Sequence, residues 1–316
     1  MVSLEKIGEF GLIKKITRKT KDINVKVGIG DDAAVIRVGK KLLAITNDAL
    51  VENVHFSFSQ FTPEQVGKKA IEINVSDIAA MGSIPKYAVI SLVLRKNVPV
   101  EKIKRLYSGI YNAAKKYSIE VIGGNTAKGS QVVIDVTMIG MVKEKELCRR
   151  SDAKPNDLIF VSGDLGKSAT AFNALKKGKD MPSMLKKAFF EPVAQLEKSR
   201  KIAAFANAME DISDGLASEV KHICEQSSTG AIIFRDNLPI SEEVRKAAKR
   251  IGKDPADMAL YGGEEFELVY TISEKNLDKA RGYLVGEITK KKGIRLYSNG
   301  KEKVMKRFGF DHFLKV

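Results

Sequence analysis

Short apolar runs alternate with longer amphipathic stretches along the first third of the chain. Residues 33–38, 41–46 and 87–94 are brief runs rich in branched apolar residues, which predicts strands. Residues 63–81 begin with proline and repeat apolar positions at helical spacing, which predicts a long helix, and residues 100–117 predict a second helix. Strands and helices mixed in this way are typical of an α/β or α+β fold.

A glycine-rich tetrapeptide interrupts the next apolar segment. Residues 119–122 predict a strand, Gly123-Gly124-Asn125-Thr126 predicts a turn, and residues 132–142 predict another strand. We expect the first domain to end with that strand, because the sequence that follows it changes in character.

A polar, charge-dense stretch at residues 143–157, which contains Pro155, separates the two parts of the chain. We therefore place a boundary near residue 145 and predict an N-terminal domain at 1–145 and a C-terminal α/β domain at 146–316. The second domain is expected to contain a strand at 158–162, a glycine turn, helices, a turn at Asp211, a helix ending near Glu225, and strands at 231–234 and 266–272.

Composition places the chain among globular proteins without membrane spans. Hydrophobic residues make up 44% and charged residues 29% of the 316 positions, and no apolar stretch is long enough to cross a bilayer. The N-terminus has no apolar signal core, which predicts a cytoplasmic protein. Cys148 and Cys224 are far apart and lack a CxxC partner, so we expect reduced thiols with no chemical role.

The net charge of +15 raises the possibility of a nucleic-acid-binding protein. Lysine pairs, however, are spread along the chain without interleaved aromatic residues and without a recognisable binding module. A solvated lysine-rich surface explains the charge better, and we expect neither a nucleic-acid partner nor a membrane partner.

Aspartates recur where an apolar run gives way to a polar or glycine-rich segment. They occur in Gly30-Asp31-Asp32, Thr46-Asn47-Asp48, Asn74-Val75-Ser76-Asp77 and Asp211-Ile212-Ser213-Asp214-Gly215. If these segments converge in space, their carboxylates repel one another unless cations lie between them. The recurrence therefore suggests a Mg²⁺ site that serves a phosphorylated substrate.

Asp77 is the most unusual of these aspartates. It lies in line with the apolar positions Val66, Ala70, Ile73 and Ala80 of the predicted helix. A lone aspartate of this kind is more often paired with a lysine or caps a neighbouring helix, but the other aspartate segments favour a site.

The neighbouring acids Asp31 and Asp32 must point in different directions, so at most one of them faces a given metal ion. Gly-Asp-Asp is also ordinary turn chemistry. The segment from Asp211 to Gly215 is a stronger signal, because two acids and a serine exceed what one helix N-cap needs.

Residues 162–168, Ser-Gly-Asp-Leu-Gly-Lys-Ser, resemble a P-loop between a strand and a helix. A P-loop requires glycine where this chain has Val161, so we predict a tight strand-to-helix turn. The common nucleotide-kinase fold is thereby excluded.

Nucleophilic catalysis through a serine or cysteine has little support. The chain has three histidines, His55, His222 and His312, and no serine or cysteine in an elbow-like motif. His222 is expected to be structural, while His55 and His312, each followed by phenylalanine, are better candidates for substrate contacts.

Seven short motifs in this order make the chain similar to the thiamine-monophosphate kinase family of the aminoimidazole ribonucleotide synthetase-like superfamily. The motifs are Gly30-Asp31-Asp32-Ala33, Asn47 to Phe56 (NDALVENVHF), Asn74 to Gly82 (NVSDIAAMG), Gly123-Gly124-Asn125-Thr126, Asp211 to Leu216 (DISDGL), Gly262 to Leu268 (GGEEFEL) and Gly309-Phe310-Asp311-His312-Phe313. The resemblance spans nearly the whole chain.

The resemblance implies a two-domain fold and a phosphotransferase that uses a phosphate group as acceptor. The N-terminal mixed sheet would pair with a second copy to form a β-barrel homodimer, and the active-site cleft would lie between the two domains. The activity implied is transfer of the γ-phosphoryl group of ATP to thiamine monophosphate, with several Mg²⁺ ions and no general base.

The family pattern also implies roles for individual residues. The metal ligands would be Asp32, Thr46, Asn47, Asp48, Asp77, Asn125, Asp211 and Asp214. The ATP contacts would be Tyr107, Gly124, Asn125, Arg150 and Ser213. The contacts to thiamine monophosphate would be His55, Glu264 and Phe310, since a cationic thiazolium suits a carboxylate and an aromatic face.

Asn125 departs from the family, which usually has aspartate at this position, and Asn47 and Glu265 depart more mildly. An amide oxygen can still bind Mg²⁺ but carries no charge. The alternatives are another ATP-using enzyme of the superfamily, acting on a phosphorylated ribonucleotide or on selenide, and the basic nucleic-acid-binding protein. A selenide enzyme should have a reactive cysteine near the N-terminus, and a carbamoyl-dehydrating relative should end in cysteine; this chain has neither.

Overall fold

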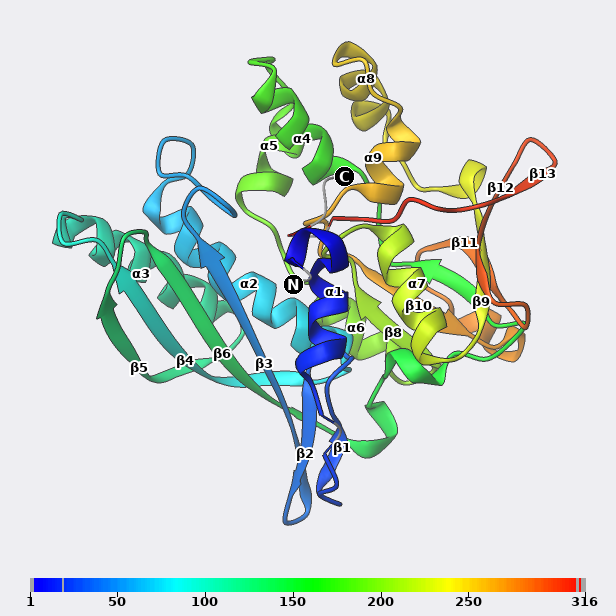
Figure 1. Cartoon of the computed structure of the whole chain (residues 1–316), viewed down its shortest axis with the longest axis horizontal. Coiled ribbons are helices and arrows are strands. Elements are labelled where there is room, and N and C mark those ends of the chain that lie inside the picture. Colours follow the sequence, from blue (N-terminus) through cyan, green and yellow to red (C-terminus); the bar gives the residue numbers. More distant parts are fainter. Residues whose placement is uncertain (1–2, 19, 311–312, 314–316) are drawn as a thin grey trace.

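The computed structural model describes residues 3–18, 20–310 and 313. Two β-sheets lie side by side, each covered by helices (Figure 1). The first sheet has six strands in the order β1-β2-β3-β6-β4-β5, and the second has seven in the order β13-β12-β9-β11-β7-β10-β8. The first sheet is built entirely from the N-terminal part of the chain and the second from the C-terminal part.

The N-terminal part contains two long helices, one of which packs on the sheet while the other packs mainly on that helix. Its elements are α1 (Leu4–Ile16), β1 (Val25–Val27), β2 (Ala34–Val38), β3 (Lys41–Val51), α2 (Pro63–Ala80), β4 (Ile84–Leu94), α3 (Val100–Lys116), β5 (Glu120–Lys128) and β6 (Val133–Val142). Strands β3, β6 and β4 pair antiparallel over most of their length, while β5 pairs parallel with β4 at the sheet edge. Every second residue of β6 is buried, as expected when helices cover one face of a sheet.

Helix α2 begins where its sequence predicts. Thr62 and Gln65 form a capping box, in which each side chain accepts the backbone N–H of the other residue, and Pro63 in the first turn has no N–H to satisfy. Helix α3 crosses α2 at two glycines: a Cβ on Gly67 would lie 2.0 Å from the carbonyl oxygen of Leu106, and a Cβ on Gly109 would lie 2.0 Å from that of Glu64. The helices approach this closely only because neither position carries a side chain.

The C-terminal part contains the second sheet and helices that are shorter than α2 and α3. Its main elements are β7 (Leu158–Val161), α4 (Lys167–Lys176), α5 (Ser183–Phe190), α6 (Leu196–Ile202), β8 (Ala208–Asp211), α7 (Leu216–Gln226), β9 (Gly230–Phe234), α8 (Glu242–Arg250), α9 (Pro255–Tyr261), β10 (Leu268–Ile272), β11 (Tyr283–Thr289), β12 (Gly293–Ser298) and β13 (Lys301–Val304). The segment between β6 and β7 contains two single-turn 3-10 helices, η1 (Glu144–Glu146) and η2 (Arg150–Asp152). The division near residue 145 stays a prediction.

Two predictions about local structure are wrong. The tetrapeptide from Gly123 to Thr126 is not a turn but part of β5, in register with residues 89–92 of β4. Here glycine permits close approach rather than reversal, because a Cβ on Gly124 would lie 1.9 Å from the carbonyl oxygen of Ile90. The strand predicted at 41–46 continues to Val51, so Asp48 lies within a strand and pairs with Val136 of β6.

The predicted strand-to-helix turn at residues 162–168 is confirmed, and Gly166 there has a φ of 87°. Strands β1, β11, β12 and β13 have no counterpart in the prediction. All four residues of β13 are exposed and carry little apolar signal. Cys148 and Cys224 are free thiols, as predicted, and both are buried. Within the described part of the chain, no helix has the length and hydropathy needed to span a membrane.

We expect Gly109→Ala to lower the free energy of unfolding by about 2 kcal/mol. Overpacking costs about 1–3 kcal/mol or more, and this exceeds the gain of about 1 kcal/mol in helix propensity. Ser108→Ala, at an exposed neighbour on the same helix, is the control and should change the free energy by less than about 0.5 kcal/mol. Urea unfolding followed by circular dichroism measures both. Equal stability of the two variants would show that α2 and α3 can separate at little cost.

Candidate functional site

A cavity of about 480 Å³ lies where the two parts of the chain meet. Residues of β3 and α2 form one wall, and residues of α4, the segment after β8 and the segment after α9 form the other. The wall includes acids and aromatic rings: Glu9, Asp48, Asp214 and Glu264, and Phe172, Phe189, Tyr261, Phe266 and Phe310. A pocket with both kinds of group suits a small molecule that has a charged end and a ring.

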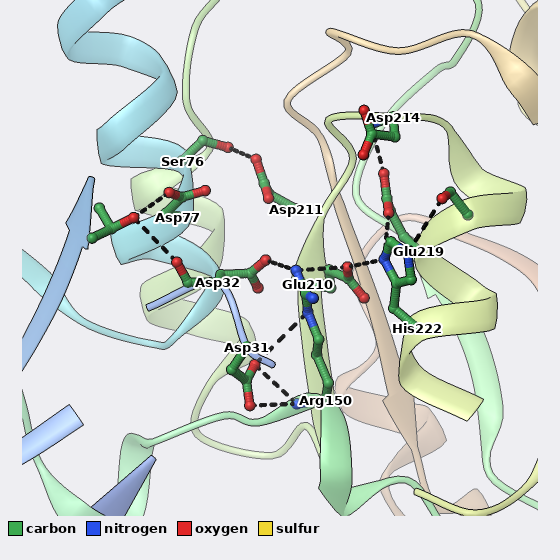
Figure 2. Close-up of polar contacts among 12 residues, drawn as sticks. Asp31, Asp32, Ser76, Asp77, Arg150, Glu210, Asp211, Asp214, Glu219 and His222 are labelled. Atoms are coloured by element: carbon green, nitrogen blue, oxygen red, sulfur yellow. Dashed lines mark hydrogen bonds and ion pairs between the residues drawn. The ribbon is translucent and has the colours of Figure 1, made fainter. Parts of the chain in front are cut away.

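Three carboxylates from different elements meet beside this cavity. Asp32 lies just before β2, Asp77 lies in the last turn of α2, and Asp211 ends β8; each offers an oxygen within 4.8 Å of the others (Figure 2). Their sequence separations show that only the tertiary fold brings them together. We call these three residues the carboxylate cluster.

Hydroxyl groups hold two members of the cluster in place. Thr46 on β3 donates to Oδ2 of Asp77 at 2.5 Å, and Ser76 donates to Oδ2 of Asp211 at 2.5 Å (Figure 2). The backbone N–H of Asp48 donates to the side chain of Asn74 at 3.2 Å, which fixes the strand against α2. The cluster is therefore oriented by groups on β3 and α2.

Burial and mutual repulsion raise the pKa values of carboxyl groups in the cluster. The pKa of Asp77 lies well above its ordinary value because the group is buried and because Asp48, Asp211 and Asp32 are close. Burial and Asp32 raise the pKa of Asp211 in the same way. Oδ2 of Asp32 is buried and has no hydrogen-bond partner among the described residues. Carboxylate and hydroxyl oxygens are the ligands that Mg²⁺ prefers, so this donor set fits that ion.

A series of residues with alternating charges extends from Asp32 to one side of the cluster (Figure 2). The guanidinium of Arg150 contacts Asp32 and lies 2.9 Å from Oε1 of Glu210. Nδ1 of His222 lies 2.9 Å from Oε1 of Glu210 and 3.1 Å from Oε2 of Glu219. Burial alone would lower the pKa of His222, but the two glutamates raise it to about 10, so His222 is a cation.

The far end of this series reaches the turn at Asp214. Oε1 of Glu219 accepts the backbone N–H groups of Asp214 and Gly215 at 2.7 and 3.1 Å. Burial and Glu219 raise the pKa of Asp214 to about 7. At the other end, Asp31 accepts the backbone N–H of Arg150 instead of joining the cluster, as expected for adjacent acids that diverge. This series of ion pairs thus connects the segment of Asp31 and Asp32 with the turn at Asp214.

The three residues that the family pattern assigns to the substrate, His55, Glu264 and Phe310, line the cavity. His55 and Phe310 are on its wall with Ser213, and Nδ1 of His55 accepts the backbone N–H of Val51 at 3.0 Å. Glu264 also faces the cavity, on a backbone with a φ of 60°. His312, the other histidine expected to contact the substrate, lies outside the described residues.

Several predicted site residues are not brought to the cluster within one chain. The side chain of Asn47 donates to Asp135 and Thr137, on the sheet face away from α2. Gly124 and Asn125 are on the edge strand β5, with β4 and β6 between them and β3. Tyr107 packs against Tyr111 on α3, with ring centroids 5.7 Å apart. The roles of these residues stay predictions.

The sequence analysis missed three buried charged residues near the site: Glu210, Glu219 and Lys69. Lys69 follows Val66 by three residues on the apolar face of α2, which is the same signal that singled out Asp77. Glu219 and His222 are three residues apart on α7, a spacing at which side chains meet. Glu210 has no such local signal, because its partners are far away in sequence.

Two family descriptions match consecutive parts of the chain. Residues 30–142 match the family described as AIR synthase related protein, N-terminal domain, and residues 154–299 match AIR synthase related protein, C-terminal domain. The predicted aminoimidazole ribonucleotide synthetase-like α/β fold is thereby confirmed.

Named relatives match over nearly their whole length. The chain is 36% identical over 318 positions to a thiamine-monophosphate kinase of Aquifex aeolicus (strain VF5), covering 98% of this chain and 99% of that protein. It is 35% identical over 328 positions to a thiamine-monophosphate kinase of Bacillus subtilis (strain 168), covering 96% and 99%.

Solved structures give the same result. A structure described as AaThiL complexed with AMPPCP and TMP superimposes with a TM-score of 0.89 at 34% identity, covering 99% of each chain. The structure of E. coli HypE superimposes with a TM-score of 0.70 at 20% identity and shows the shared fold alone.

We expect Mg²⁺ to raise the thermal midpoint of the protein, and to raise it more at about pH 8 than at about pH 5.5. The pKa of Asp214 is raised to about 7 and those of Asp77 and Asp211 are also raised. The stability that these protonated groups contribute is therefore complete below about pH 4 and is lost as the pH rises through their raised pKa values. The ionised groups at the higher pH repel one another and bind a divalent cation best.

Asp77→Asn tests whether the cluster is the cation site. At about pH 8 the variant should melt higher than the wild type in EDTA, because it removes a charge that repels the other carboxylates, and it should show about half or less of the Mg²⁺ shift. Asp180→Asn, at an exposed carboxylate paired with Lys186, is the control and should keep the full shift. A full Mg²⁺ shift in Asp77→Asn would place the cation elsewhere.

Proposed function

Because this chain belongs to the thiamine-monophosphate kinase family of the AIR synthase related proteins, we propose that it transfers the γ-phosphoryl group of ATP to thiamine monophosphate. The products are thiamine diphosphate and ADP. The observation that carries the proposal is the carboxylate cluster beside a cavity with aromatic walls, in a chain that superimposes on a relative complexed with AMPPCP and TMP.

The chemistry of the acceptor explains why the site needs no general base. A phosphate monoester has a second pKa of about 6, so near neutral pH it is already largely a dianion. His222 suits no proton abstraction, since Glu210 and Glu219 hold it as a cation. The barrier that remains is repulsion between two polyanions.

Asp32, Asp77 and Asp211, with Asp48, Asp214 and Thr46, would hold Mg²⁺ in this site. Bound there, Mg²⁺ would neutralise charge on the phosphates of both substrates. The protein's own part is positioning: Ser76 and Thr46 orient two carboxylates, and Glu219 holds the turn of Asp214 by two backbone N–H groups. Asn47 and Asn125, which lie away from this cluster within one chain, remain proposed as ligands of a further Mg²⁺ ion.

The cavity is proposed to bind thiamine monophosphate through His55, Glu264 and Phe310. In the neutral form, His55 carries its proton on Nε2, because Nδ1 accepts the N–H of Val51. A donor at Nε2 suits a phosphate oxygen. Phe310 is half exposed at the cavity and offers a ring face for the heterocycle.

We further propose that the chain acts as a homodimer and that ATP binds where two copies meet. Strand β5 is the sheet edge, and residues 122–128 are exposed, so its hydrogen-bonding groups are available to a second copy. Gly124 and Asn125 lie on this edge strand. They are proposed to contact ATP together with Tyr107, Arg150 and Ser213, which lie elsewhere in the chain. A second copy would give them a role that they lack in a single chain.

A cytoplasmic location suits the proposal, because both cysteines are buried free thiols and ATP is the co-substrate.

Activity is tested by incubating the protein with ATP, Mg²⁺ and thiamine monophosphate and measuring thiamine diphosphate. Asp214→Asn should lower kcat/KM by about 100-fold or more, because it removes one of the carboxylates proposed to hold the Mg²⁺ that neutralises the phosphates. Asp236→Asn, at an exposed acid, is the control and should keep wild-type activity. Absence of product from the wild type at every Mg²⁺ concentration would refute the function, and unchanged activity in Asp214→Asn would refute the role of that residue.

The homodimer is tested by light scattering, which should give twice the mass of one chain. Ile122→Lys places a charge on the exposed face of β5 and should shift the protein toward the monomer and lower kcat/KM about tenfold or more. Val304→Lys, on the exposed edge strand β13 of the other sheet, should keep the dimer. A wild type with the mass of one chain would contradict the proposal.

A further inference from the structure

Lys69 is a charged residue with no exposed surface, and the phosphate chemistry above does not use it. It lies on α2, four residues before Ile73, which lines the cavity. An ammonium group removed from water needs close partners, because loss of solvation disfavours the charge. The identity of its partners therefore indicates its role.

The partners of Lys69 come from both parts of the chain. Nζ lies 2.6 Å from Oε1 of Glu264 and donates to the carbonyl oxygen of His55 at 3.2 Å. The ring centroids of Phe61 and Phe189 lie 5.5 and 5.7 Å from Nζ, so both rings make cation–π contacts. Among the described residues, the ammonium thus has one acidic partner and is otherwise enclosed by rings and a carbonyl group.

Glu264 lies on an uncommon backbone conformation at the cavity wall. Its φ of 60° is uncommon for a residue with a side chain, and its N–H donates to the carbonyl oxygen of Ser213 at 2.7 Å. One third of the side chain is exposed, at the cavity wall. Lys69 belongs to the N-terminal part of the chain and Glu264 to the C-terminal part, so their ion pair joins the two parts.

We propose that Lys69 is a specificity-determining positioning residue, which fixes Glu264 as a neutralised and oriented hydrogen-bond acceptor in the substrate pocket. The inference rests on the proposed function, in which the substrate carries a cationic thiazolium ring and an aminopyrimidine ring with N–H donors. Lys69 already neutralises the carboxylate, so Glu264 does not attract the thiazolium through net charge. It accepts an N–H of the aminopyrimidine at the oxygen that Lys69 does not hold. The aromatic walls, including Phe172 and Phe310, are left to receive the cationic ring.

Steady-state kinetics of Lys69→Met test this role. Methionine keeps the length and apolar stem but removes the charge, so Glu264 loses its fixed orientation. We expect KM for thiamine monophosphate to rise about tenfold or more, while kcat and KM for ATP change by less than about twofold. Lys68→Met is the matched control: Lys68 is the next residue on α2 and pairs with Glu191 outside the cavity, so all three constants should stay at their wild-type values.

The pairing of the two charges is tested by Glu264→Gln. This variant leaves Lys69 as an uncompensated cation beside a cationic substrate, so KM for thiamine monophosphate should rise more than in Lys69→Met. Adding Lys69→Met to Glu264→Gln should lower KM again, because the unpaired charge is removed. A residue that only supports the fold would change the melting temperature of each variant without this order of KM values.

Three results would overturn the inference: an unchanged KM in Lys69→Met, a KM that falls because a freed carboxylate attracts the cation, or a double variant no better than Glu264→Gln. If Lys69→Met does not fold, Lys69→Arg replaces it, since the longer guanidinium keeps the charge but displaces the carboxyl group; an unchanged KM there also overturns the inference. A wild type that makes no thiamine diphosphate would refute the proposed function instead.

Discussion

Repulsion between buried carboxylates is the constraint on which the rest of this structure depends. Asp32, Asp77 and Asp211 meet within 4.8 Å, and burial magnifies their repulsion because little water screens it. No single element could hold them there. The end of α2, the end of β8 and the loop before β2 are each anchored by packing in one of two sheets, and hydroxyl groups fix the carboxylate orientations. The rigidity of the two sheets is thus what makes the unfavourable arrangement possible.

Buried carboxylates in this protein are stabilised in two different ways. Around Glu210, Glu219 and Glu264 it supplies its own cations, Arg150, His222 and Lys69, at distances of 2.6–3.1 Å. In the carboxylate cluster, Arg150 reaches Asp32, while Asp77 and Asp211 are oriented by hydroxyl groups that carry no charge. Permanent side-chain cations suit positions that keep one geometry, whereas exchangeable cations suit positions where charged phosphates arrive and leave. This division separates the groups that shape the site from those that face the reaction.

The sequence predicts the parts of the site that leave a local trace. Asp77 interrupts an apolar helical stripe, and Asp211 and Asp214 exceed the needs of a helix cap, so both signals are visible without a structure. The glycines at 123 and 124 misled the prediction, because glycine marks both reversals and close approaches and only the neighbouring strand decides between them. The role of Glu210 could not be predicted, since it depends on contacts with Arg150 and His222 that only the tertiary structure forms. Lys69 carried the same local signal as Asp77 and could have been found.

The left-handed backbone at Glu264 has a consequence for engineering this enzyme. Glycine adopts a φ near 60° without strain, and asparagine does so more readily than glutamate, so a search for stabilising substitutions would favour either residue at this position. Both would remove the carboxyl group that faces the cavity and leave Lys69 without its acid. Local conformational preference and substrate recognition thus compete at one residue, and thermal stability alone would be a misleading criterion for choosing variants there.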